Sequence, residues 1–330
     1  MNIAIITDGN EQLGLGHVYQ SLTLAKALKE RNFLVNINFM TKSDEKICDF
    51  LASDGYKVTQ YDNDDAIFAQ LKIDNPERVI FDKLDVCPVL AEKIKKELKI
   101  KLVIFTNLTE ASNYADVTVF PGFGNDFTHG VHRNKDTKKI DFYGLKYWLL
   151  RSEFYLFKKK KKRSNKDVLN RIMLMFGASD PANMTSHVLN VLLQLPMQCE
   201  IRIVLGSSFS HLEKLNQIIQ RYPLTTNKIS IMQNIKNVAE IMSSSDLVMT
   251  SPGLSLSEAL VVETPVIGFH QNEQQKTEYA GILPTLGLDD LHRLPLLIKN
   301  RDFIYPDSPL ILAMEIGEGK EEVITEILAN

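Results

Sequence analysis

The chain has 330 residues and a net charge of −3, with 44% hydrophobic and 24% charged residues. This composition is ordinary for a globular protein of about two domains, and its near-balanced charge gives no electrostatic reason to expect a nucleic-acid partner. The cysteines (Cys48, Cys87 and Cys199) are scattered without metal-ligand spacing, which argues against a disulfide scaffold and suits a reducing compartment.

Three further absences narrow the class of protein. The seven histidines do not cluster with carboxylates, so we expect no metal site and no cofactor. No basic-then-apolar leader opens the sequence, and no uncharged run approaches the ~18 residues of a membrane span. A cytoplasmic protein is therefore expected.

The first half alternates short apolar runs with helical patterns. Strands are predicted at Asn2–Thr7, Leu34–Met40, Lys57–Tyr61, Arg78–Phe81, Lys101–Thr106 and Val117–Phe120. Helices are predicted at Val18–Glu30, Asp44–Ser53, Ala66–Leu71 and Pro88–Leu98. Such alternation indicates βαβ units and a parallel sheet that is covered on both faces.

A Gly-Leu-Gly-His-Val turn joins the first strand to the first helix. Gly14 and Gly16 let the backbone approach a ligand, and the new helix offers unpaired N–H groups to an anion. His17 is expected at the carboxyl end of the sheet, where open α/β folds bind ligands, and imidazole exchanges protons near neutrality. The turn is therefore a candidate ligand site with His17 as its acid or base. A tight turn with a surface histidine is the alternative.

The same edge of the sheet offers a second pair of candidates. Asp82 and Lys83 end the fourth predicted strand and face the expected ligand position.

The amino-acid composition changes in the middle of the chain. Gly122–Lys139 is polar and reads as a loop, and Lys158–Arg163 is a run of six basic residues. Such a run is typical of a solvated linker, and a patch for anionic lipid head groups is the alternative. We place the domain boundary here, with one domain at 1–157 and the other at 158–330.

The second half repeats the α/β rhythm. Strands are predicted at Arg171–Phe176, Glu200–Leu205, Lys228–Met232, Asp246–Thr250 and Pro265–His270. Helices are predicted at Thr185–Leu195, His211–Tyr222, Val238–Ser243, Ser255–Val262 and Lys320–Leu328. Two similar halves predict an α/β protein with two Rossmann-like, doubly wound domains that face each other across a cleft.

Two turns in the second half carry small and hydroxyl residues between a strand and a helix. In the first turn, amides around Gly177 and Ser179 can point at phosphate oxygens. Asp180 and Asn183 lie in the same turn and are candidate ligand contacts. The alternative is a helix start capped by Asp180 or Asn183, with Pro181 in its first turn.

The second turn is Thr250–Ala259. A diphosphate fits the amides of Leu254 and Ser255 after Gly253, and Glu258 is placed to accept hydrogen bonds from vicinal hydroxyls. A carboxylate in a first helical turn also suits the helix dipole without any ligand. Downstream, the candidates are His270, Gln274 and Gln275, for which a polar loop is the alternative.

These residues resemble the PseG/SpsG family of UDP-sugar hydrolases and spore-coat polysaccharide proteins, which share the GT-B architecture of MurG-type glycosyltransferases. The resemblance covers nearly the whole chain. It is carried by Gly14–His17, the Tyr147–Phe154 segment, Gly177–Thr185 and Gly253–Glu258. It implies a UDP-sugar in the cleft, with the nucleotide on the second domain and His17 facing the sugar.

The chain departs from the family pattern in its first domain. The family arginine three residues past the histidine is Gln20, which cannot supply a guanidinium charge. The family Asp-x-Tyr reads Asp82-Lys83-Leu84, and the expected Asp-Asp reads Thr106-Asn107. Gln274-Gln275 looks more like the MurG-type pattern.

Four functions follow in order of preference. The first is metal-free hydrolysis of a UDP-linked acylated amino sugar to UDP and free sugar, with His17 as general base. The second is a MurG-like glycosyltransferase, held near a membrane-bound acceptor by Lys158–Arg163. The third is a degenerate protein that binds a UDP-sugar without turnover. A dehydrogenase is disfavoured because the third glycine of the dinucleotide fingerprint is missing. The sequence does not specify the sugar, its acyl groups, any acceptor or the oligomeric state.

Overall fold

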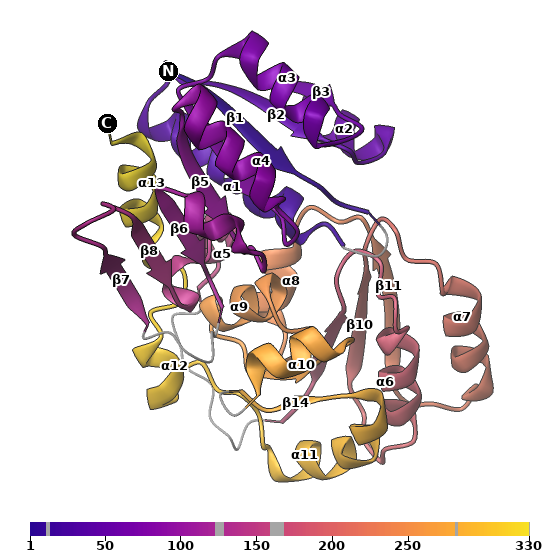
Figure 1. Cartoon of the computed structure of the whole chain (residues 1–330). Coiled ribbons are helices and arrows are strands. Elements are labelled where there is room, and N and C mark those ends of the chain that lie inside the picture. The colour runs from indigo at the N-terminus through magenta and orange to yellow at the C-terminus, as the bar shows by residue number, and fades with distance from the viewer. Residues whose placement is uncertain (11–13, 123–128, 159–167, 281–282, 330) are drawn as a thin grey trace. The chain divides into compact units, whose positions relative to one another are not determined.

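The computed structural model describes residues 1–10, 14–122, 129–158, 168–280 and 283–329 (Figure 1). The chain divides into two compact units. The first unit joins Met1–Leu149 to Gly317–Asn330, and the second is Leu150–Ile316.

The first unit is built on one sheet. Its described strands follow the order β3-β2-β1-β4-β5-β6-β8-β7. Neighbours are parallel except for the β7–β8 pair at the edge. The strands are β1 (Asn2–Thr7), β2 (Asn36–Thr41), β3 (Lys57–Gln60), β4 (Arg78–Asp82), β5 (Lys101–Phe105), β6 (Val117–Phe120), β7 (Gly130–Arg133) and β8 (Ile140–Tyr143).

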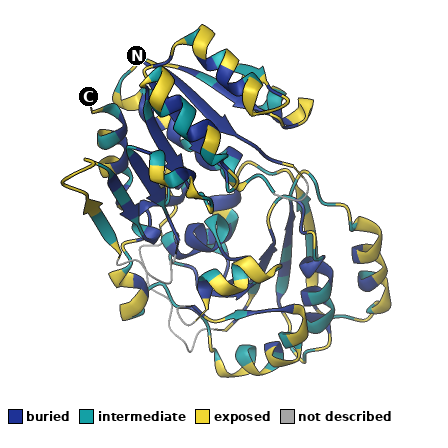
Figure 2. Cartoon of the chain, viewed as in Figure 1, coloured by how far each residue is buried: buried dark blue, intermediate teal, exposed yellow. Residues whose placement is uncertain are grey.

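Helices cover both faces of this sheet, so successive side chains of a strand enter two different cores. In β1, Ile3 and Ile5 pack with α1, whereas Ala4 and Ile6 pack on the opposite side. The central strands are accordingly dark blue in Figure 2. The helical segments are α1 (Gly16–Arg31), α2 (Glu45–Ser53), α3 (Asp64–Asp74), α4 (Pro88–Lys93), η1 (Ile94–Leu98), η2 (Glu110–Tyr114), η3 (Leu145–Tyr147) and α13 (Lys320–Leu328).

The last helix belongs to the first unit, which differs from the predicted domains of 1–157 and 158–330. Val323, Ile324 and Ile327 of α13 are buried in the same core as α1. The N–H groups of Gly317 and Gly319 donate to carbonyls of η3 at 3.1 and 2.8 Å. An amphipathic pattern specifies that α13 covers an apolar face, but not which sheet provides that face.

The second unit contains a smaller sheet of the same kind. Its described strands are all parallel, in the order β11-β10-β9-β12-β13-β14. They are β9 (Arg171–Met175), β10 (Glu200–Leu205), β11 (Lys228–Gln233), β12 (Leu247–Thr250), β13 (Val266–Phe269) and β14 (Thr285–Leu286). The order reverses between β9 and β12, which is where open α/β sheets bind ligands.

The helices of the second unit include several that the sequence patterns did not predict. They are α5 (Ser152–Leu156), α6 (Met184–Leu193), α7 (Leu212–Arg221), α8 (Val238–Ser244), α9 (Leu254–Val261), α10 (Glu273–Tyr279), η4 (Leu288–Arg293), α11 (Leu294–Asn300) and α12 (Pro309–Ala313). Each of the unpredicted helices has fewer than eight residues and therefore shows little periodicity in its sequence; they are α5, α10, η4, α11 and α12.

The predicted loop Gly122–Lys139 was wrong over part of its length. Gly130–Arg133 forms β7, which pairs antiparallel with β8. It is a four-residue edge strand with two exposed residues, so it lacks the alternation of a buried strand.

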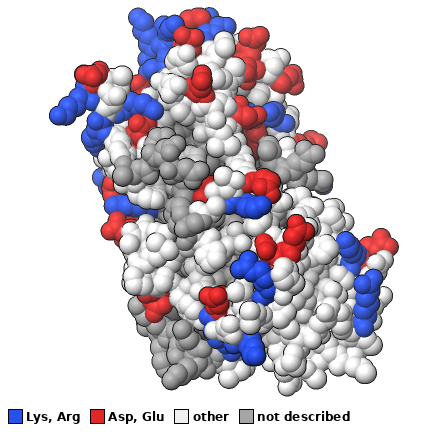
Figure 3. Space-filling view, turned by 60° about the horizontal axis from the view of Figure 1, so that its bottom comes forward, with Lys and Arg blue, Asp and Glu red and all other residues white. Residues whose placement is uncertain are grey.

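One residue of the predicted basic run, Lys158, lies within the described residues. Lys158 is exposed with its Nζ 3.6 Å from a carboxylate oxygen of Glu263, whereas Lys159–Arg163 lies outside the described residues. On the face drawn in Figure 3, acidic and basic side chains are interspersed. Within the described ranges, no helix combines the length and the apolarity that crossing a bilayer requires.

Candidate functional site

His17 is held at the carboxyl edge of the first sheet by a hydrogen bond to Asp82. The β1–β4 register pairs Thr7 with Asp82, so the two strands end side by side. The turn after β1 leads into α1, whose second residue is His17. Its Nδ1 lies 2.8 Å from Oδ1 of Asp82. The two residues that the sequence placed at separate strand ends are therefore in direct contact.

The Asp82 carboxylate is buried and fully engaged. Its side chain has no solvent exposure, and it also accepts hydrogen bonds from Gln20 Nε2 at 3.0 and 3.1 Å and from Ser21 Oγ at 2.9 Å. An ionised carboxylate only accepts, so Nδ1 of His17 carries a hydrogen and donates it. This leaves Nε2 of a neutral His17 with its lone pair, as a general base requires. His17 itself is 16% exposed, so it is accessible from solvent.

The environment makes His17 a stronger base than a free histidine. Burial lowers the pKa of His17, but the hydrogen bond and the charge of Asp82 outweigh burial, and the pKa is raised above its usual value. The charges of Asp8 and Asp85 act in the same direction.

Lys83 belongs to a second, separate polar cluster. Its Nζ lies 2.8 Å from Asp8 and 3.3 Å from Asp85, and its side chain is 9% exposed. Tyr61 donates its hydroxyl to the same Asp8 carboxylate at 2.8 Å. Burial lowers the pKa of Lys83, but its hydrogen bond to Asp8 and the charge of Asp8 outweigh burial and raise it. Lys83 is therefore committed to an ion pair, and its contact with a sugar stays a prediction.

The remaining candidates near this turn are Gly14, Gly16 and Gln20, and they differ in burial and in hydrogen bonding. Gly14 has φ of +75°, which glycine adopts without strain, and donates its N–H to Asn10 at 2.8 Å. Gly16 is exposed, and a Cβ there would meet nothing within 4 Å. Gln20 is 1% exposed, and its Oε1 is buried without a hydrogen-bond partner among the described residues. Gln20 thus reaches Asp82 rather than solvent.

In the second unit, the turn after β9 is organised by Asp180. Gly177, Asp180 and Asn183 have φ of +82°, +47° and +51°. The Asp180 carboxylate accepts from the N–H groups of Met184 at 2.8 Å and Thr185 at 2.9 Å, so Asp180 caps α6 as the alternative reading expected. The amides of Met184 and Thr185 are therefore not open to a phosphate, whereas phosphate binding by the amides around Gly177 and Ser179 stays a prediction.

Two further residues of this turn remain candidates. Ser179 is 6% exposed, and Asn183 is 4% exposed with both amide atoms buried and unpartnered among the described residues. A buried, unpaired amide is costly unless a ligand or water satisfies it.

The turn after β12 differs because it leads into a helix whose first amides have no capping side chain. Gly253 has φ of +113°, and α9 begins at Leu254 with no acidic residue in its first turn and no side-chain cap. The N–H groups of Leu254 and Ser255 therefore start a helix whose dipole is uncompensated there. Of the two helix starts considered for phosphate binding, α9 is the one left uncapped.

Glu258 lies one turn further along α9 and is 2% exposed. Its Oε1 accepts hydrogen bonds from Arg151 Nε at 3.2 Å and Nη2 at 3.1 Å. Burial raises the pKa of Glu258 to about 7, although Arg151 opposes the shift.

The downstream candidates surround a residue that sequence reasoning missed, Gln271. Its Nε2 donates to Ser251 Oγ at 2.7 Å and to the Phe176 carbonyl at 3.1 Å, so it ties the ends of β9 and β12 together. Gln275 accepts the Gln271 N–H at 2.8 Å, and Gln274 is exposed. His270 Nδ1 lies 2.9 Å from Thr285 Oγ1.

Sequence reasoning also overlooked Ser21, Asp8 and Tyr61 in the first unit. Asp8, directly after β1, was detectable by its place at a strand end. The partners Ser21 and Tyr61 carry no such signal, because hydroxyl groups in a helix and after a short strand are common.

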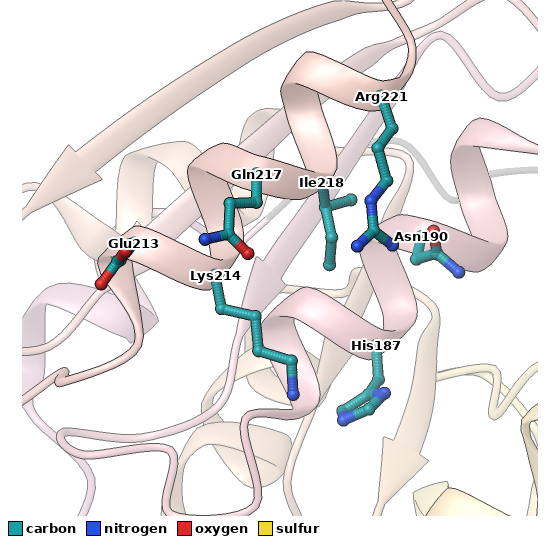
Figure 4. Close-up of a pocket in the computed structure, with 7 residues that line it drawn as sticks. All are labelled: His187, Asn190, Glu213, Lys214, Gln217, Ile218 and Arg221. Atoms are coloured by element: carbon teal, nitrogen blue, oxygen red, sulfur yellow. The ribbon is translucent and has the colours of Figure 1, made fainter.

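A polar groove is lined by other residues of the second unit. It has a volume of about 480 Å³ and lies between α6 and α7. Lys214 and Arg221 of α7 reach toward His187 and Asn190 of α6 (Figure 4). None of its lining residues belongs to the predicted site.

The sequence was compared with family models and with known proteins, and the structure with solved structures. No family model matches the sequence. An uncharacterized protein of Methanocaldococcus jannaschii is 39% identical over 99% of this chain, which spans 66% of that relative's length. The spore coat polysaccharide biosynthesis protein SpsG of Bacillus subtilis is 26% identical, covering 96% of this chain and 93% of SpsG. A UDP-2,4-diacetamido-2,4,6-trideoxy-beta-L-altropyranose hydrolase of Campylobacter jejuni is 22% identical, covering 80% of this chain and 89% of the hydrolase.

Solved structures show the same fold over the whole chain. MurG of Acinetobacter baumannii superposes with a TM-score of 0.60 at 14% identity, covering 99% of both chains. The UDP-GlcNAc 2-epimerase of Neisseria meningitidis gives a TM-score of 0.62 at 11% identity, covering 100% of both chains. The chain therefore has the α/β GT-B fold, as predicted. Its sequence is similar to those of SpsG and the altropyranose hydrolase, in agreement with the predicted resemblance to the PseG/SpsG family.

Proposed function

We propose that this protein is an enzyme of polysaccharide or nonulosonic acid biosynthesis that hydrolyses a UDP-linked acylated amino sugar to UDP and the free sugar. The observation that carries the proposal is the His17–Asp82 hydrogen bond at a strand end, which leaves Nε2 of His17 available as a base. The relationship to SpsG and to the altropyranose hydrolase supports the substrate class.

In the proposed reaction, Nε2 of His17 accepts a proton from water as the water oxygen forms a bond to the anomeric carbon. The bond between that carbon and the phosphate oxygen breaks, and its electron pair leaves with UDP. His17 then returns its proton to solvent. Asp82 holds the ring in the required tautomer and stabilises the imidazolium that forms.

The second unit is proposed to bind the nucleotide. The uncapped amides of Leu254 and Ser255 suit a diphosphate, and the α9 dipole favours the charge that develops on departing UDP. Glu258 is proposed to accept hydrogen bonds from the ribose hydroxyls.

The test is UDP release from a panel of UDP-sugars without any acceptor. His17→Ala is expected to slow release by about a hundredfold or more, since that is the usual contribution of a general base. His187→Ala, a histidine in the groove between α6 and α7, is the matched control and should leave the rate unchanged. An unaltered rate in His17→Ala would remove His17 from the mechanism.

Isotopic labelling follows the bond that breaks. Hydrolysis in ¹⁸O-labelled water should place the label in the free sugar. Label recovered in UDP would show attack at phosphorus and would contradict the proposed reaction.

A glycosyltransferase is the second candidate, favoured by the fold shared with MurG and by Gln274-Gln275. It requires UDP release that appears only when an acceptor is supplied. Saturable UDP-sugar binding without product in either assay would instead identify a binding protein without turnover.

A further inference from the structure

The Tyr147–Phe154 segment was singled out by its sequence but has no part in the proposed reaction. The chain enters the second unit at Leu150, and Arg151 follows directly before α5. The Arg151 guanidinium is fixed on three sides. Nε and Nη2 donate to Glu258, Nη1 lies 3.1 Å from Glu153, and the group stacks 4.7 Å from the centre of the Phe154 ring.

Arg151 binds a single oxygen atom of the buried Glu258 carboxylate. The hydrogen bonds from Nε and Nη2 of Arg151 to Glu258 both end on Oε1, which leaves Oε2 for another donor. Glu258 lies on α9 one turn after Ser255, where the diphosphate is proposed to bind. A carboxylate oxygen that is held in place there can accept hydroxyl hydrogen bonds from a nucleoside.

Arg151 is also the cation that favours the charged form of this carboxylate, against the effect of burial. The elements packed on α9 include α5, α8, β12 and β13. β12 and β13 carry no charged residue, and Glu240 of α8 is exposed. Glu153, the acidic neighbour on α5, raises the pKa of Glu258 and Arg151 lowers it. Without Arg151, burial leaves Glu258 protonated at neutral pH.

We propose that Arg151 is a positioning residue of the nucleotide site, which places a positive charge beside Glu258 and orients its carboxylate to accept hydrogen bonds from the ligand's ribose diol. This inference rests on the proposed function, since it requires a ribonucleotide at α9. An ion pair that only anchors the segment before α5 is the competing role. The two differ in ribose recognition, because an anchor has no reason to distinguish a ribonucleotide from its deoxy analogue.

The experiment compares the affinities of UDP and 2′-deoxy-UDP by calorimetry. The wild-type protein should bind UDP about tenfold more tightly or better, since a hydrogen bond to a charged group contributes that much. In Arg151→Met the preference should disappear at pH 7 and increase as the pH is raised, because burial without the nearby cation favours the protonated form of Glu258. In Glu258→Gln the preference should not depend on pH.

Arg202→Met is the matched control. Arg202 pairs with Glu200 on β10 in the same unit, so its loss should leave the preference intact. A preference retained by Arg151→Met at pH 7 would overturn the positioning role and leave the anchor.

Wild-type protein alone provides a second measurement in case Arg151→Met does not fold. Its preference for UDP should weaken as the pH falls below 7, because Glu258 gains a proton. A preference that is constant from pH 5.5 to 8.5 would overturn the inference. Absence of UDP binding at any pH would instead contradict the proposed function, whereas UDP binding without ribose preference would remove only the Glu258–ribose contact.

Discussion

At the scale of single residues, the feature that matters most is the shared dependence of His17 and Gln20 on Asp82. Asp82 receives a hydrogen bond from an imidazole, an amide and a hydroxyl group, and among these donors only His17 can carry a charge. The buried carboxylate therefore favours the imidazolium form of His17. A neutral glutamine at position 20 leaves this effect undiminished.

Asp82→Asn should lower both the pKa of His17 and the rate. The substitution removes the charge and the acceptor that raise the pKa, so burial would then dominate. His17 is a base only when neutral, so activity in the wild type rises as the pH passes the raised pKa. In the variant this rise should move to lower pH, and the maximal rate should fall by about a hundredfold. A pH–rate profile and the NMR titration of His17 measure both effects, and an unshifted titration would contradict the assignment.

Gln20→Arg should lower the pKa of His17 without removing Asp82. A guanidinium beside Asp82 supplies a fixed cation, so the carboxylate no longer depends on His17 for compensation. NMR titration of His17 measures the shift. Ser21→Ala is the control, because it removes a neutral donor and introduces no charge. Equal titrations in Gln20→Arg and the wild type would show that position 20 does not tune the histidine.

At the scale of elements, the two helix starts of the second unit have different roles. Asp180 satisfies the amides at the start of α6, whereas α9 begins without a cap after Gly253. Similar strand–turn–helix sequences therefore lead to one helix start whose first amides are capped and one whose first amides are not.

Asp180→Ala should destabilise the protein by about 1–2 kcal/mol, which is the usual effect of losing an N-cap. Because the Asp180 carboxylate is occupied by Met184 and Thr185, UDP affinity should change little. Denaturant unfolding and calorimetry test the two statements. A large loss of affinity with unchanged stability would assign Asp180 to the ligand instead.

Gly253→Ala should impair both stability and UDP binding. With φ of +113° at this position, a side chain introduces strain of about 1–3 kcal/mol and displaces the amides that follow. UDP affinity should therefore fall strongly. Unimpaired binding in this variant would locate the diphosphate elsewhere.

At the scale of the whole molecule, the first unit is discontinuous in sequence. α13 returns to it and buries Ile327 in the core shared with α1. Ile327→Ala should destabilise this unit by about 2–5 kcal/mol, and amide exchange should accelerate in β1 and α1 but not in α6 or α9. Thr325→Ala, an exposed position on the same helix, is the control. Faster exchange confined to the second unit would contradict the observed division of the chain.

The sequence by itself determined most of the longer strands and helices, though not short elements such as β7 and α10, and the edge of the sheet at which His17 lies. Apolar runs and helical periodicity follow from burial of each segment, and parallel βαβ order places turns such as Gly14–His17 at the carboxyl ends. The family resemblance, too, depends on local motifs.

Only the tertiary structure decided which side chains meet. The pairing of Thr7 with Asp82 brings His17 and Gln20 to one carboxylate, and the path of the chain before α5 brings Arg151 to Glu258. It also assigned Asp180 to a cap and α13 to the first unit. Apart from the local Asp180 cap, these contacts join residues far apart in the chain, so their partners depend on strand register and packing, which local periodicity does not encode.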